Sequence, residues 1–92
     1  MPRPLKVYGV LGWRVGCPAA PNGNRQTREV VAARSKAEAA RLLGCSLHWL
    51  NSYGSETWND RELVVAMASP GTVFWRPNHL SGAEYQPAGG KA

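Results

Sequence analysis

Two cysteines and two histidines are the residues of this chain best suited to metal chemistry. Cys45 and His48 are three positions apart, a workable spacing for two ligands of one zinc ion. Cys17 and His79 lie in unrelated stretches, whereas structural zinc sites usually carry two tight pairs of ligands. We therefore expect free thiols, surface histidines and no bound metal.

The other reactive side chains form none of the usual catalytic patterns. The chain has six carboxylates, but it shows no nucleophile signature and no glycine-rich phosphate loop between a strand and a helix. The spacing Gly9-x-x-Gly12 lies inside a predicted strand, where glycine indicates twist or the close approach of another backbone. The sequence therefore predicts a protein that is not an enzyme and needs no cofactor.

The elements that must position any functional residue follow from periodicity and helix caps. Alternating apolar residues predict a long strand, and a turn-rich loop over 16–26 separates it from a returning strand that is covered on both faces. Capping boxes begin at Ser35 and Asn59, and Ser46 caps a short helix between them. In chain order, the patterns predict strands at 5–15 and 27–34, helices at 36–43, 47–53 and 60–69, and a strand at 72–76.

These elements predict one small α+β domain over residues 1–77. Its order, β-β-α-α-α-β, suits an antiparallel three-stranded sheet with a helical hairpin and a third helix on one face. Residues 78–92 lack periodicity and are expected to form an irregular C-terminal extension. With 92 residues the core must be small. We expect four tryptophans to supply much of its apolar area, unless some of them lie at the surface as binding anchors: Trp13, Trp49, Trp58 and Trp75.

Residues 35–53 have the spacing of a helix-turn-helix. Ala40 is a small side chain where two helices would cross, and Gly44 follows where the turn needs a positive φ. A helical hairpin that packs on the sheet or docks a protein needs glycine for the same steric reason. The second helix has one apolar face, which we expect to be buried: Leu47, Leu50 and Tyr53.

The charge distribution argues against DNA as the first-choice ligand. The formal net charge is +5, but residues 1–41 carry eight basic and two acidic side chains, whereas residues 42–92 carry three basic and four acidic ones. Phosphate contacts supply most of the affinity for DNA and need cations near the recognition helix. A DNA-binding function is therefore the alternative, with these residues as its candidates: Arg34, Lys36, Arg41, Ser46, His48 and Asn51.

A protein partner is the leading interpretation of the same region. Tryptophan is enriched among interface hot spots, and Trp58 lies in a polar turn where a large apolar residue either staples the next helix or faces a partner. A third option, an RNA-binding sheet built on Tyr8, Trp13 and Trp75, lacks interleaved basic residues. The candidate protein-binding residues are His48, Trp49, Tyr53 and Trp58, with Arg25 and Arg28 as a charged rim.

Three stretches resemble a family of small accessory proteins encoded by actinobacteriophages and related prophages, of the mycobacteriophage host-takeover type. They are Ser35-Lys-Ala-Glu-Ala-Ala-Arg-Leu-Leu-Gly44, then Tyr53-Gly54-Ser55-Glu56-Thr57 with Asn59, and Pro70-Gly71-Thr-Val-Phe-Trp-Arg-Pro77. The similarity covers roughly residues 5–77. In that family the turn reads Ser-Glu-Thr-Gly-Asn, so Trp58 replaces a glycine here.

The resemblance implies a phage origin and a small, non-enzymatic accessory role. Phage proteins of this size often bind one host macromolecule and disturb its function. The sequence has no signal peptide and no stretch long enough to cross a bilayer. We therefore expect a monomeric or homodimeric protein without membrane insertion, located in the host cytoplasm, that binds a host protein and inhibits growth when expressed.

Overall fold

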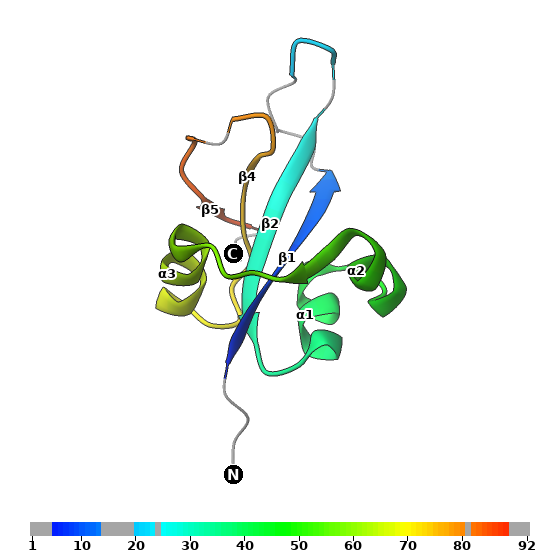
Figure 1. Ribbon diagram of the computed structural model, residues 1–92, viewed down its shortest axis with the longest axis vertical. Coiled ribbons are helices and arrows are strands. Elements are labelled where there is room, and N and C mark those ends of the chain that lie inside the picture. Colours follow the sequence, from blue (N-terminus) through cyan, green and yellow to red (C-terminus); the bar gives the residue numbers. More distant parts are fainter. Residues whose placement is uncertain (1–4, 14–19, 24, 81, 89–92) are drawn as a thin grey trace.

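The computed structural model describes residues 5–13, 20–23, 25–80 and 82–88, which form a small α+β fold (Figure 1). The strands are β1 (Lys6–Trp13), β2 (Gln26–Ala33), β3 (Gly54–Glu56), β4 (Phe74–Pro77) and β5 (Gln86–Pro87). The helices are α1 (Lys36–Leu43), α2 (Leu47–Tyr53) and α3 (Asp60–Ala68). None of these helices is long and apolar enough to span a bilayer.

Among the described residues the sheet has five strands in the order β3-β1-β2-β4-β5, and every neighbouring pair is antiparallel. The predicted three-stranded sheet was therefore incomplete. β1 and β2 pair over their whole length, from Lys6↔Ala33 to Trp13↔Gln26. β3 covers β1 only from Tyr8 to Val10. Within the described part of the chain, the end of β1 (residues 11–13) has no strand on its outer side.

The helices cover both faces of the sheet, and the prediction of one helical face was wrong. One core cluster joins Tyr8, Val10 and Val31 to α1 and to Leu50 of α2. A second cluster joins Val7, Val30 and Ala32 to Ala66 of α3. Because neighbouring strand residues point to opposite faces, these clusters lie on opposite sides of β1 and β2. In Figure 1, α3 lies to the left of these strands and α1 and α2 lie to their right.

The turn between α1 and α2 has the predicted caps. Ser35 Oγ accepts a hydrogen bond from Glu38 N, and Ser46 Oγ accepts one from Trp49 N. Gly44 ends α1 with φ of 77°, in the left-handed region, and its N–H donates to carbonyls of the last turn. The chain therefore turns between α1 and α2, and the two helices contact each other.

The core consists mainly of side chains smaller than the tryptophans that were expected to supply much of its area. Valine, alanine and Leu50 make up most of it, whereas Trp13, Trp49 and Trp58 are 63%, 44% and 76% exposed. On α2 only Leu50 is buried. Leu47 and Tyr53 of the predicted buried face are exposed. For these three side chains the core interpretation was therefore wrong, and their exposure fits the surface alternative.

The predicted C-terminal extension contributes to the domain. β5 pairs with β4 through Phe74↔Pro87 and Trp75↔Gln86. Tyr85 packs against the core cluster beneath α3. Residues 82–88 are therefore partly regular, and residues 89–92 lie outside the described part of the chain. The loop predicted over 16–26 is described only at 20–23 and 25–26, where Gln26 already belongs to β2.

Candidate functional site

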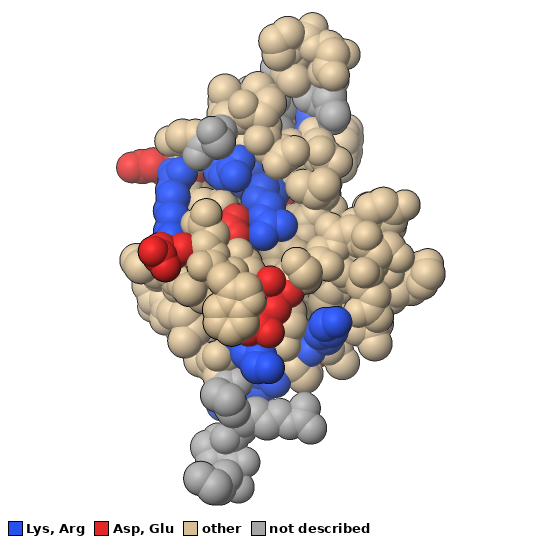
Figure 2. Space-filling view, in the orientation of Figure 1, with Lys and Arg blue, Asp and Glu red and all other residues tan. Residues whose placement is uncertain are grey.

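One side of α2 carries two exposed aromatic rings. Trp49 and Tyr53 are one helical turn apart, and their ring centroids lie 4.3 Å from each other at an interplanar angle of 41°. Leu47 is 45% exposed on the same helix. α2 contains no Lys, Arg, Asp or Glu. Figure 2 shows uncharged surface over this helix, on the right of the view.

Trp49 joins this helix to the open end of β1. Its indole Nε1 donates a hydrogen bond to the carbonyl oxygen of Leu11, at 3.3 Å. A hollow of about 240 Å³ lies beside this contact, and Trp13, Trp49 and Gln26 are among its lining residues. We call the combined patch the aromatic surface, and it consists of Trp13, Trp49 and Tyr53. The sequence did not assign Trp13 to this patch, because its approach to Trp49 depends on how α2 packs against β1.

Only some of the predicted protein-binding residues lie at the aromatic surface. His48 is exposed on α2, and Arg25 directly precedes Gln26, which pairs with Trp13. Trp58 follows Thr57, whose N–H donates to Val7 O near the start of β1. Val7 is four residues from Leu11, or about 14 Å along an extended strand. Trp58 is therefore associated with the other end of β1.

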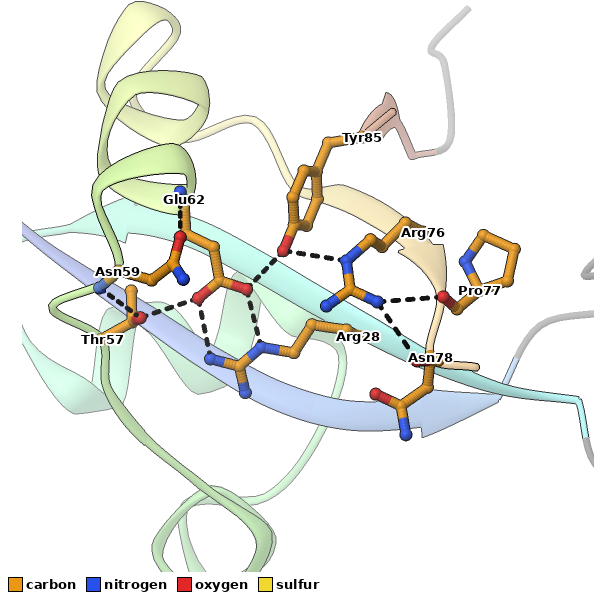
Figure 3. A network of polar contacts seen from close by, with 8 residues as sticks. All are labelled: Arg28, Thr57, Asn59, Glu62, Arg76, Pro77, Asn78 and Tyr85. Atoms are coloured by element: carbon orange, nitrogen blue, oxygen red, sulfur yellow. Dashed lines mark hydrogen bonds and ion pairs between the residues drawn. The ribbon is translucent and has the colours of Figure 1, made fainter. Parts of the chain in front are cut away.

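The remaining predicted residue, Arg28, belongs to a polar network on the face that α3 covers (Figure 3). Arg28 Nε and Nη2 donate to the two carboxylate oxygens of Glu62, at 2.9 and 3.0 Å. Glu62 also accepts from Thr57 Oγ1 at 2.7 Å and from Tyr85 Oη. A Cβ at Gly9 would overlap the Arg28 guanidinium, so glycine makes room for it on the sheet. Arg28 therefore holds α3 to the sheet and does not form the rim of the aromatic surface.

The network shifts the ionisation of its members. Burial alone would raise the pKa of Glu62, but the hydrogen bonds from Arg28, Tyr85 and Thr57 outweigh burial and lower it to about 2. Burial and the hydrogen bond to Glu62 raise the pKa of Tyr85. Arg76 donates from Nε to Tyr85 Oη at 3.2 Å. Each polar group in the network has a partner, which is the pattern of a structural ion pair.

No family model, curated protein or solved structure matches this chain.

The predicted DNA-binding residues are split between exposed positions and local contacts. Arg34, Arg41 and His48 are exposed. Lys36 Nζ donates to Asn51 Oδ1 at 3.2 Å, so the amide that would read a base edge already has a partner. Ser46 uses its hydroxyl as the cap of α2. α1 and α2 are thus joined by a short turn, and within it Asn51 and Ser46 make contacts of the hairpin itself.

The metal and RNA hypotheses have little support in the geometry. In residues 5–13, 20–23, 25–80 and 82–88, no group of three His, Cys, Asp or Glu side chains could hold a metal ion. Cys45 is a free thiol, and Cys17 lies outside the described residues. Tyr8, one of three residues expected to stack on RNA bases, is 5% exposed beneath α1 and α2. A base therefore has no access to its ring.

Proposed function

We propose that this chain is a small, non-catalytic phage protein that binds a protein of its bacterial host in the cytoplasm, disturbs the function of that protein and thereby inhibits growth. The single observation that carries this proposal is the aromatic surface. It gathers Trp49, Tyr53 and Trp13 at one end of the sheet, outside the core.

The composition of the aromatic surface is that of an interface centre. Aromatic residues are enriched and charged residues depleted at the centre of protein interfaces, and charged groups are pushed to the rim. Here α2 carries no charged residue, and Arg25 directly precedes Gln26, which lines the hollow beside Trp13 and Trp49. An exposed apolar patch on a small domain also costs free energy in water, because its area is left unburied. A partner that covers the patch would recover that free energy.

DNA binding by the helix-turn-helix is the alternative function, and one observation favours it. Arg34 and Arg41 are exposed at the two ends of α1, where they could contact a phosphate backbone. The second helix of a DNA reader needs cations nearby to hold the phosphates, but α2 carries no Lys or Arg, and its Asn51 amide oxygen already accepts from Lys36. We therefore rank DNA second.

Affinity capture from a lysate of an actinobacterial host, with and without nuclease, tests the proposal. We expect the tagged chain to retain one host protein whose recovery is unchanged by nuclease, and to slow growth when it is expressed in that host. Loss of the captured material on nuclease treatment, together with salt-dependent retention on duplex DNA, would support the alternative. In that case, alanine at Arg34, Lys36 and Arg41 should weaken DNA retention. Failure to retain any host protein would contradict the proposal.

A further inference from the structure

Two arginines face each other across neighbouring strands, on the side of the sheet that α3 covers. Arg28 on β2 is directly opposite Arg76 on β4. The next pair on this face, Val30 and Phe74, belongs to the core cluster beneath α3. Like charges at directly opposite positions of a sheet repel each other and destabilise it. An anion that binds both side chains would remove this repulsion.

The Glu62 carboxylate lies between these two arginines. It accepts from Arg28 and from the Tyr85 hydroxyl, and that hydroxyl accepts in turn from Arg76 Nε. The guanidinium carbon of Arg61 is 5.3 Å from the centre of the same tyrosine ring. We call these five residues the arginine cluster. Because Arg28 and Arg76 alone outnumber Glu62, the cluster keeps a positive charge, and Figure 2 shows basic side chains gathered above α3 in that view.

Both facing guanidinium groups keep N–H donors that the chain does not use. All nitrogens of a guanidinium are donors. Arg28 donates from Nε and Nη2, whereas Arg76 donates from Nε and Nη1. Within the described part of the chain, Arg28 Nη1 and Arg76 Nη2 therefore have no hydrogen-bond partner, and no dashed line reaches them in Figure 3. No buried side-chain nitrogen of the described residues lacks a partner, so these two nitrogens are open to solvent.

The unused donors are held in fixed positions. Glu62 binds the other edge of the Arg28 guanidinium, and Gly9 gives that guanidinium room against β1. Arg76 Nη1 donates to the backbone oxygens of Pro77 and Asn78, at 3.0 and 3.3 Å. Donors that are already positioned bind a ligand with little further loss of side-chain freedom.

We propose that the arginine cluster binds the phosphate group of a phosphate monoester. Such a group carries about −1.5 to −2 charges at neutral pH and several strong acceptor oxygens. Its oxygens are not in one plane, so it accepts from two guanidinium groups on different strands, whereas one guanidinium already satisfies a planar carboxylate. The adjacent Asp60 and Glu84 are exposed, where water screens their charges. Because α1 and α2 lie on the opposite face, this inference does not depend on the proposed function.

Nuclear magnetic resonance on the ¹⁵N-labelled chain tests the inference with methyl phosphate and acetate at neutral pH and constant ionic strength. The hydrogen-bonded Nε–H groups of Arg28 and Arg76 report on the cluster. We expect methyl phosphate to shift both signals to saturation and to bind at least about tenfold more tightly than acetate, because it carries more charge and more acceptors. Equal binding of acetate, or no saturable shift with methyl phosphate, would overturn the inference without any variant.

Inorganic phosphate is the third probe, and it distinguishes an ester from the free ion. We expect it to bind about as tightly as methyl phosphate, because the two unused nitrogens are open to solvent and leave room for the organic group of an ester. Binding of inorganic phosphate alone would overturn the assignment to an ester.

An Arg76→Met variant locates the effect. Methionine keeps an apolar stem but removes the guanidinium, so methyl phosphate should bind at least about tenfold more weakly. Arg41→Met is the matched control, because it removes an exposed charge from α1 on the opposite face, and it should retain wild-type binding. Unchanged tryptophan indole signals verify the fold of both variants. Wild-type binding in Arg76→Met, or equal losses in the two variants, would contradict the assignment.

Discussion

Replacing Glu62 with Gln is expected to lower the free energy of unfolding by about 3 kcal/mol at neutral pH. The substitution removes the charge that pairs with Arg28, whose side chain is only 21% exposed. An unpaired guanidinium at the interface of α3 and the sheet must then be partly resolvated, which loosens the packing of Ala66 on Val30. Urea unfolding of the wild-type chain and the variant, followed by far-ultraviolet circular dichroism, measures the difference.

Glu56→Gln provides the control for this measurement. Glu56 pairs with Lys6 at 3.8 Å, and the two side chains are 27% and 50% exposed. Exposed ion pairs of this kind contribute about 0–1 kcal/mol, because water and salt screen them. If Glu62→Gln lowers the free energy of unfolding by no more than Glu56→Gln does, the network does not hold α3 to the sheet.

The stability that the Glu62 carboxylate contributes to the folded chain depends on pH. The pKa of Glu62 falls from an ordinary value near 4.5 to about 2 in the folded chain, so the unfolded chain takes up its proton first as the pH is lowered. The stabilisation is therefore complete above pH 4.5 and is lost as the pH falls towards 2. The shift corresponds to about 3 kcal/mol. The difference in stability between the wild-type chain and Glu62→Gln should shrink over this range, and a constant difference would contradict the assignment.

The elements that the sequence revealed are those whose signals are local. Strands β1 and β2 are eight residues each and apolar enough to be recognised by composition. Each helix begins with a capping side chain that accepts a hydrogen bond from the backbone N–H three residues later: Ser35, Ser46 and Asn59. β3 and β5 are three and two residues long, and they exist only because distant strands offer them an edge. Periodicity cannot detect such strands.

The candidate site was harder to predict, because its residues meet through non-local packing. The capping pattern identified Asn59 and Glu62 correctly, and Asn59 Oδ1 does accept from Glu62 N. The pattern does not show that the Glu62 carboxylate reaches Arg28, 34 positions earlier. In α2, helical spacing predicted an apolar face that packs inward, but the chain enters β3 directly after Tyr53. That short connection places Leu50 alone in the core and leaves the aromatic rings outside.

Replacing Trp49 with Ala is expected to abolish partner capture while the fold persists. The side chain is 44% exposed, and its described polar contact is one hydrogen bond to Leu11 O. Its loss should lower the free energy of unfolding by no more than about 1.5 kcal/mol. At a buried interface, truncation of a central tryptophan costs about 2 kcal/mol or more, which corresponds to at least about a thirtyfold weaker affinity. Titration calorimetry with the captured host protein, alongside thermal unfolding, separates the two effects.

Trp58→Ala is the matched control, because it deletes the same side chain at a more exposed position, 76% exposed, near the other end of β1. If the partner binds the aromatic surface, Trp58→Ala should retain wild-type affinity, whereas Tyr53→Ala should weaken it because Tyr53 stacks on Trp49. Equal losses of affinity in Trp49→Ala and Trp58→Ala would mean that the interface extends along β1 to both ends. A loss of affinity in Trp58→Ala alone would mean that the partner does not bind at α2. A large drop in the unfolding temperature of Trp49→Ala would reassign Trp49 to the core.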